Sequence, residues 1–250
     1  MARFSQLEFD EAGPERQITG GEPVRDAAYF YKEAIRSQLA GDFELALRNY
    51  SRMLEENKTF FEAWLGQALM LIELGECNEA IVWADKALEL FPQQPELFAV
   101  KAIACCRDLK MEKAVTYSDI SVNKDNTTSR VWLARAEVMF DRKSSISVSC
   151  LSKAVSMAGK EIGIIRLDAA RLLRQKGSYS AAIEHLNEAI RIFPKSALAW
   201  YELGCCQAEL GYSEARATLE QSLKLRPNWK KAKTAMSKCK GGFFRRLFGR

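Results

Sequence analysis

The sequence predicts an all-α protein built as a solenoid of stacked helix pairs, and three periodic features support that prediction. Small residues recur at a fixed interval of about 34 residues, at Ala34, Ala68, Ala102, Ala136, Ala170 and Gly204. Aromatic residues recur at the same interval, at Phe30, Trp64, Phe98, Trp132 and Trp200, with Arg166 interrupting the row. Glycines follow it at Gly41, Gly75, Gly177 and Gly211. A fixed period of this length is typical of stacked helix pairs, and such arrays usually form binding surfaces.

Six units of one helix pair each follow from this register, after a flexible acidic N-terminal segment at 1–26. They cover 27–60, 61–94, 95–128, 129–162, 163–196 and 197–229. The small residue lets the two helices of a pair approach closely, and the aromatic residue fills the space between successive units. Glycine permits the left-handed turn inside a pair. Proline at Pro92, Pro194 and Pro227 ends the second helix.

The third, fourth and sixth units depart from the pattern. Leu109 and Lys143 stand where glycine is expected. The serine-rich second helix of the fourth unit fits the pattern only after a one-residue shift. The sixth unit lacks one residue between its helices, which places Ala215 rather than Arg216 on the inner face. We therefore expect the middle of the array to be its least regular part.

The repeated landmarks resemble those of the tetratricopeptide repeat family. The second unit runs Trp64, Ala68, Leu71, Gly75, Ala80, Ala84, Ala87, Leu88 and Pro92, and the fifth and sixth units repeat much of this series. The family pattern is W-x2-L-G-x2-Y, then glycine, A-x3-F and proline. The resemblance covers about residues 27 to 229. It implies a right-handed α-solenoid of about six such pairs, whose first helices line a concave groove.

That groove is the expected binding site for a peptide or helical segment of a partner protein. Its candidate residues combine apolar anchors with arginines for acidic contacts: Leu65, Leu69, Ile103, Arg130, Leu133, Phe140, Arg171, Arg174 and Tyr201. The alternative is that many of these residues contact the neighbouring repeat instead.

One known binding mode of the resembling family is disfavoured. Chaperone-binding members hold a terminal carboxylate with lysines, asparagines and an arginine on their first three units. The matching positions are apolar or aromatic in this chain, at Tyr31, Ile35, Leu69, Ala99 and Ile103. The sequence therefore argues against a chaperone adaptor that uses this carboxylate clamp.

The C-terminal end carries a second signal. No acidic residue follows Glu220, and residues 224–250 contain ten basic residues. A capping helix is expected at 228–240, because a solenoid must cover the apolar face of its last unit. Gly241 and Gly242 should then break the helix before a basic amphipathic tail at 241–250. In that tail the apolar and basic residues fall on opposite arcs of a helix: Phe243, Phe244, Arg245, Arg246, Leu247 and Phe248.

Three binding modes of this tail remain open. It can lie on an anionic membrane surface, dock on a partner protein, or fold back into the chain's own groove. Nucleic acid is not an expected partner, because the body lacks a known nucleic-acid module. The sequence leaves the oligomeric state open.

The composition argues against an enzyme, a metal site or a cofactor. His185 is the only histidine, and the chain shows no phosphate-binding glycine loop or catalytic triad order. The seven cysteines are odd in number and lack CxxC spacing, which favours thiols packed as small apolar groups. No apolar run reaches about 18 residues. We expect a cytoplasmic protein, with possible peripheral attachment to the cytoplasmic face of a membrane.

Overall fold

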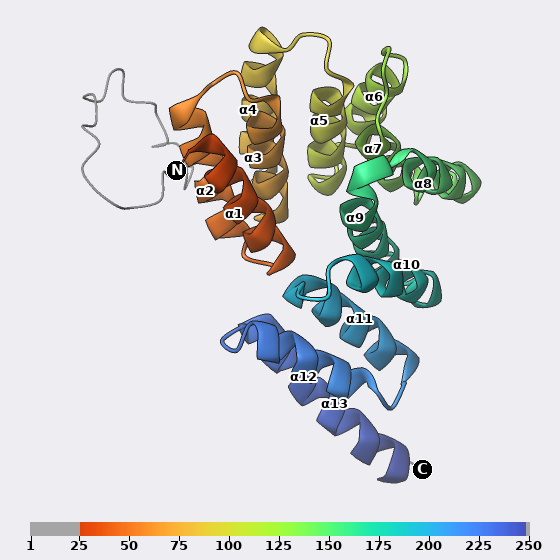
Figure 1. Ribbon diagram of the computed structural model, residues 1–250. Helices are drawn as coiled ribbons and strands as arrows, with labels where there is room; N and C mark the ends of the chain where they lie inside the picture. Colours follow the sequence, from red (N-terminus) through yellow and green to blue (C-terminus); the bar gives the residue numbers. More distant parts are fainter. Residues whose placement is uncertain (1–25, 249–250) are drawn as a thin grey trace, which may run out of the picture. The chain divides into compact units, whose positions relative to one another are not determined.

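The computed structural model describes residues 26–248, with side chains described for residues 26–239. In that part of the chain every regular element is a helix, as the sequence predicted (Figure 1). The helices are α1 (Ala27–Leu39), α2 (Phe43–Glu56), α3 (Phe61–Glu73), α4 (Cys77–Leu90), α5 (Pro95–Arg107), α6 (Met111–Val122), α7 (Ser129–Met139), α8 (Ser144–Met157), the 3-10 helix η1 (Gly159–Glu161), α9 (Ile162–Gln175), α10 (Tyr179–Ile192), α11 (Ala197–Leu210), α12 (Ala215–Leu225) and α13 (Lys230–Phe248).

These helices group into two compact units, which are described separately. The first unit holds residues 26–37 and 42–124, and the second holds residues 38–41 and 125–248. Each of the six sequence windows contains one pair of consecutive α-helices, although α9 begins one residue before its window at Ile162. The odd-numbered helices from α1 to α11 are the first helices of their pairs, and the even-numbered helices are the second.

The recurring small residues lie where the two helices of a pair touch. Ala34, Ala68, Ala102, Ala136 and Ala170 are fully buried. At the sixth of these positions, a Cβ on Gly204 would lie 2.6 Å from Leu219 Cγ of the paired helix. A separation that short is not tolerated in a packed interior. The period therefore reflects close helix approach, as the sequence predicted.

The turns between paired helices also follow the prediction. Gly41, Gly75, Gly177 and Gly211 all have left-handed backbone, with φ between 74° and 86°. Leu109 replaces glycine in the third pair and still adopts φ 58°, a conformation that an L-residue with a side chain rarely adopts. Lys143 in the fourth pair has φ −147° instead, so the α7–α8 turn has a different geometry.

Burial confirms the one-residue shifts expected in α8 and α12. The recurring alanines buried on α4 are Ala80, Ala84 and Ala87, and the buried residues of α8 include Ser147, Leu151 and Ala154, each one repeat position earlier. In α12, Ala215 is buried and Arg216 is exposed. In both pairs four residues separate the two helices, at 140–143 and 211–214, whereas three residues separate them in the other four pairs.

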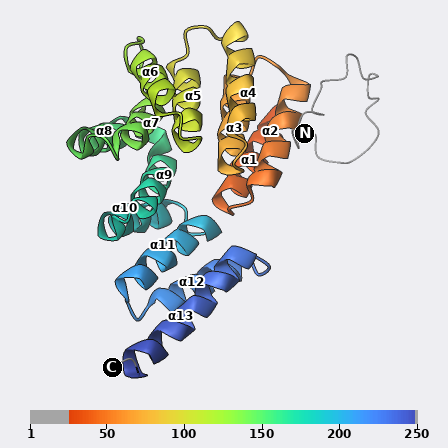
Figure 2. The same cartoon turned by 180° about the vertical axis from the view of Figure 1, so that it is seen from behind.

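In the first unit, one core cluster extends from α1 to α5, where α3 packs against α4 and α5 (Figures 1 and 2). Trp64 and Trp83 meet inside it with ring centroids 5.3 Å apart. The ring of Tyr50 lies directly against Gly66, where a Cβ would come within 2.4 Å of Tyr50 Cζ. The Trp64–Trp83 contact thus lies within the second pair, whereas the Tyr50 ring of α2 fills space against α3 of the next pair.

In the second unit, α10 packs against α9 and α11, and α12 packs against α11 and α13. Ser196 caps α11, because its Oγ accepts a hydrogen bond from the Ala199 backbone nitrogen at 3.1 Å. At the other end of this unit, Trp229 and Ala232 are buried and close its last pair. The start of α13 thus covers the apolar face left by α12.

The predicted end of the capping helix is wrong. We expected a cap at 228–240 that breaks at Gly241–Gly242, whereas α13 runs without interruption from Lys230 to Phe248. Glycine lowers helix stability by about 1 kcal/mol relative to alanine but does not forbid helix, and the helix-forming residues on both sides continue the turn. Among the described residues, no helix is both long and apolar enough to cross a membrane.

Candidate functional site

The nine residues predicted to line a groove all lie on or directly after first helices. Each is half-buried or buried on its inner side, so none projects freely into solvent. Leu65, Leu69 and Ile103 belong to α3 and α5 of the first unit. We call these three, together with Glu73 and Arg107, the α3–α5 surface. The other six form the α7–α11 surface of the second unit: Arg130, Leu133, Phe140, Arg171, Arg174 and Tyr201.

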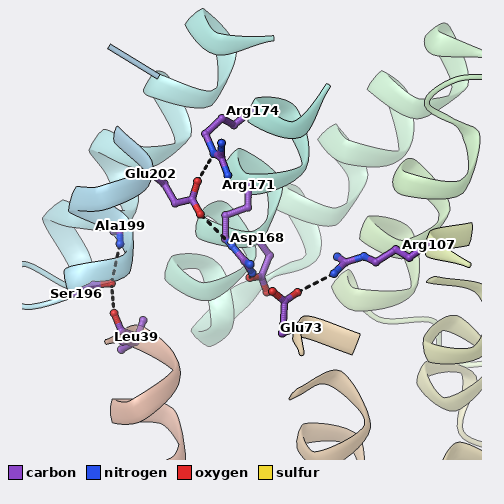
Figure 3. A network of polar contacts seen from close by, with 9 residues as sticks. All are labelled: Leu39, Glu73, Arg107, Asp168, Arg171, Arg174, Ser196, Ala199 and Glu202. Carbon is purple, nitrogen blue, oxygen red and sulfur yellow. Dashed lines mark hydrogen bonds and ion pairs between the residues drawn. The ribbon is translucent and has the colours of Figure 1, made fainter. Parts of the chain in front are cut away.

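The α3–α5 surface is mostly apolar. Leu65, Leu69 and Ile103 pack with their inner sides against the first unit's core cluster. Beside them, Arg107 Nη1 donates a hydrogen bond to Glu73 Oε1 at 3.1 Å (Figure 3). These two residues stand one repeat apart at the same helical position, so the ion pair links two first helices in register. This ion pair is a contact between neighbouring repeats, and whether Leu65, Leu69 and Ile103 bind a partner stays a prediction.

The positions that would hold a carboxylate clamp are apolar in the structure as well. Tyr31 packs edge-on against Tyr50, with ring centroids 6.5 Å apart. Ala99 is buried, and Leu69 and Ile103 lie on the core cluster. None of these side chains offers a cation to a carboxylate, so this surface lacks the chemistry of the clamp.

The α7–α11 surface is polar at its centre. Arg174 Nε donates a hydrogen bond to Glu202 Oε2 (Figure 3). Arg171 Nε lies 3.5 Å from the other oxygen of Glu202, and Arg171 Nη1 lies 3.6 Å from Asp168 Oδ1. The side chain of Glu202 is only 4% exposed. One buried carboxylate from α11 therefore holds two arginines that α9 presents.

Sequence analysis missed the role of Glu202. It assigned Arg171 and Arg174 to contacts with an acidic partner, whereas both have an acidic neighbour inside the chain. A signal was available, because Asp168 and Glu202 stand one repeat apart at the same position of successive first helices. Carboxylates recurring at an inner position next to arginines point to ion pairs between neighbouring repeats.

This buried network shifts the ionisation of its members. Burial lowers the pKa of Arg174, but Glu202 together with Cys205 and Tyr201 more than offsets that effect, and the net pKa is raised. Burial raises the pKa of Tyr201, and it raises the pKa of the adjacent Cys205 thiol to about 11. Arg174 is therefore a permanent cation beside a neutral phenol and a neutral thiol.

The remaining residues of the α7–α11 surface surround this network. Arg130 Nη2 contacts Glu161 Oε1 at 3.4 Å. Leu133 packs against the cluster formed by Ala154, Ala158 and Ile165. The ring of Phe140 carries Lys176 Nζ at 5.7 Å from its centroid, and Lys176 also bonds Asp141. Tyr201 packs on Trp229 with ring centroids 4.7 Å apart.

The cysteines and the histidine of the described residues lie mostly in buried or half-buried places. All seven cysteines are free, and burial raises the pKa of Cys105, Cys150 and Cys206, which favours the unreactive thiol. His185 is half-buried, and burial next to Arg166 lowers its pKa. In the described part of the chain no group of three or more candidate ligands could hold a metal ion.

The predicted tail site lies outside the described side chains. It comprises Phe243, Phe244, Arg245, Arg246, Leu247 and Phe248. The backbone of α13 carries these residues as a continuation of the capping helix, and whether they bind membrane, a partner or the chain itself stays a prediction.

Comparison with protein families matches three segments of the chain. A tetratricopeptide repeat model covers residues 31–95, a TPR repeat model covers 170–211, and a further tetratricopeptide repeat model covers 197–228. The matched segments include the whole of α2 to α4 and of α10 to α12.

Relatives and solved structures agree with this assignment. An Hsp70-Hsp90 organizing protein of Triticum aestivum is 27% identical over 205 residues, which is 77% of this chain and 34% of that protein. Yeast Tom70 superposes with a TM-score of 0.56 at 17% identity over 90% of this chain and 48% of its own. The APC/C hetero-tetramer Cut9–Hcn1 gives a TM-score of 0.55 at 17% identity over 86% and 43%. The chain thus spans about a third of the wheat relative.

Proposed function

The chain belongs to the tetratricopeptide repeat family, and on that premise we propose that it is a non-catalytic adaptor or assembly scaffold that binds a segment of a partner protein. The expected ligand is an extended peptide or a helix. The expected binding surface is formed by the first helices of the pairs, which are also the helices that line the groove inferred from the sequence.

One observation carries this proposal. The apolar residues predicted for binding on the α3–α5 surface have an inner side in the core and an outer side that a partner can cover. This applies to Leu65, Leu69 and Ile103. Apolar side chains that are already fixed by packing lose little conformational entropy when a partner covers them. They are therefore suited to anchor an apolar ligand residue.

The relatives support the adaptor role without naming the partner. The wheat protein is named as an organizer of two chaperones, but the apolar residues Tyr31, Ala99 and Ile103 remove the carboxylate clamp from this chain. We therefore propose that this chain recognises its partner segment without a carboxylate clamp. The first three units would not hold the terminal carboxylate of a chaperone.

A random-peptide display library tests the proposal directly. The full chain should enrich a family of peptides with recurring apolar residues. Leu69→Lys combined with Ile103→Lys should lose them, because two cations then replace the apolar anchors. The matched control is Val82→Lys with Leu90→Lys on α4, where both side chains are more than half exposed on a second helix. Circular dichroism must show equal helicity for both variants.

Enrichment that survives in the Leu69 and Ile103 variant would remove the α3–α5 surface from the proposal. Enrichment lost equally in the α4 control would mean that added positive charge, not position, was responsible. Failure of the wild-type chain to enrich any peptide would contradict the adaptor function as stated.

A second candidate role follows from α13. Residues 224–239 contain six basic residues and no acidic one, and the helix continues as far as Phe248. We propose that this helix can hold the adaptor at an anionic membrane face. The proposed location is the cytoplasm, which suits a chain whose seven thiols are free.

Vesicles containing anionic phosphatidylserine test the membrane role against vesicles of neutral phosphatidylcholine. Binding should require the anionic lipid, weaken with salt, and disappear when the chain is truncated after Lys240. Equal binding by the truncated chain would exclude residues 241–250 as the attachment element.

A further inference from the structure

We propose that Arg174 is a dedicated carboxylate-binding residue, which reads an aspartate or glutamate side chain in the partner segment. This inference rests on the adaptor function proposed above and specifies the ligand chemistry of the α7–α11 surface. It separates Arg174 from Arg171 and Arg130, which sequence analysis had grouped with it.

The guanidinium of Arg174 is only partly used inside the chain. Its Nε donates to Glu202, and no hydrogen bond or ion pair joins its two terminal nitrogens to another described residue. A guanidinium carries five N–H donors, four of them on the terminal nitrogens. The side chain is 29% exposed. The terminal edge of the fork is therefore open to a ligand.

Arg171 differs from Arg174 in how fully the chain engages it. It lies 3.5 Å from Glu202 and 3.6 Å from Asp168, and its side chain is only 13% exposed. Two carboxylates thus approach one buried guanidinium. Arg171 acts as a positioning residue, because its contact with Glu202 holds that carboxylate in place beside Arg174.

Glu202 fixes the direction in which Arg174 points. Its side chain is 4% exposed and comes from α11, whereas Arg174 stands in the last turn of α9. A hydrogen bond from Nε to Glu202 holds one edge of the planar group (Figure 3), while no other described residue bonds the terminal nitrogens. A guanidinium held in this way loses less entropy on binding than a free side chain. This preorganisation favours a bidentate contact.

The open edge selects a carboxylate by geometry. Two parallel N–H groups of a guanidinium match the two oxygens of a carboxylate. Aromatic residues stand at related positions: Phe140 occupies the same repeat position as Arg174 one unit earlier, and Tyr201 precedes Glu202 on α11. A partner segment with an acidic residue beside an apolar one therefore fits this site better than a free anion.

The test compares peptides that differ in one group. Peptides enriched by the wild-type chain from the random display library are resynthesised with the acidic residue changed to its amide. Fluorescence polarisation should show that wild type binds the acid form about tenfold more tightly, the size expected of a charge-assisted bidentate contact. Arg174→Gln should bind acid and amide equally, and Arg174→Lys should retain only part of the preference, because it keeps the charge without the fork.

Arg191→Gln is the matched control, since Arg191 is an exposed arginine of α10 that pairs with Glu188. It should keep the full acid preference. An acid preference that is unchanged in Arg174→Gln would overturn the inference, as would enriched peptides that contain no acidic residue. If the wild-type chain enriches no peptide at all, the adaptor function itself fails, which is a distinguishable result.

Discussion

The two units use the same repeat to build different first-helix surfaces. On the α3–α5 surface, Leu69 and Ile103 occupy one repeat position in succession, and the ion pair of Glu73 with Arg107 lies at the edge. On the α7–α11 surface the equivalent position of α9 is Arg171, and a buried Glu202 joins it to Arg174. The backbone repeats, while the chemistry of the surface is set by a few positions.

The two units also differ in net charge. Residues 26–124 contain 16 acidic and 11 basic residues, a net charge of −5, whereas residues 125–239 contain 11 acidic and 19 basic residues, a net charge of +8. Opposite charges steer different ligands toward a surface. The first-helix surfaces therefore differ in chemistry, apolar in the first unit and centred on ion pairs in the second, although both units repeat the same helix pair.

The largest expected change in the free energy of unfolding comes from two core substitutions, which also test whether the units unfold separately. Leu71→Ala in the first unit and Leu186→Ala in the second each empty a fully buried site, which costs about 2–5 kcal/mol. Because a repeat contacts mainly its neighbours, hydrogen exchange should accelerate in the unit that carries the substitution. Uniform acceleration over both units in either variant would show that they unfold as one.

The ion pairs of the two units should contribute differently to the free energy of unfolding. Glu202→Gln leaves two arginines without their buried carboxylate and should lower the free energy of unfolding by about 3 kcal/mol. Glu73→Gln breaks a pair whose acidic partner is more exposed than Glu202 and should cost about 1 kcal/mol. Urea denaturation measures both. Equal costs would mean that the second unit's network is no more important to folding than the first unit's pair.

Exchanging leucine and glycine in a left-handed turn should change the free energy of unfolding by a smaller amount. Removing the leucine in the first unit should stabilise it, and introducing a leucine in the second unit should destabilise it. Leu109 has φ 58° and is 86% exposed, so Leu109→Gly should stabilise the first unit by about 1 kcal/mol. Gly177→Leu should destabilise the second unit by a similar amount, since nothing within 4 Å would contact the new Cβ and only the backbone is strained. Thermal denaturation of both variants checks the pair.

Acid should affect the second unit first. The pKa of His185 is lowered in the fold by burial and by Arg166, so the unfolded chain binds the proton more readily. The stability that depends on neutral His185 is therefore complete above the ordinary pKa of 6.5 and decreases as the pH falls below it. Hydrogen exchange at a pH about one unit below that value should show weaker protection in α9 and α10, and His185→Asn should remove that change. Loss of protection in the first unit alone would contradict this, because the first unit contains no histidine.

The sequence by itself determined the repeat. Its fixed period decides which residues face the paired helix, since only small side chains permit close approach and only glycine adopts the left-handed turn at low cost. Ala68, Gly75 and Trp64 could therefore be assigned from the sequence alone, and so could the shift that buries Ala215. The burial of these small residues and the geometry of these turns depend on residues nearby in the sequence.

Only the tertiary structure decided how the surface side chains are paired. Glu202 belongs to a different repeat from Arg171 and Arg174, and no local rule states that its carboxylate turns inward to hold them. The structure also shows α13 continuing through Gly241 and Gly242, because the loss of helix propensity at two glycines is too small to end a helix. Periodicity decides where a residue stands, and packing between successive repeats decides which partner it meets.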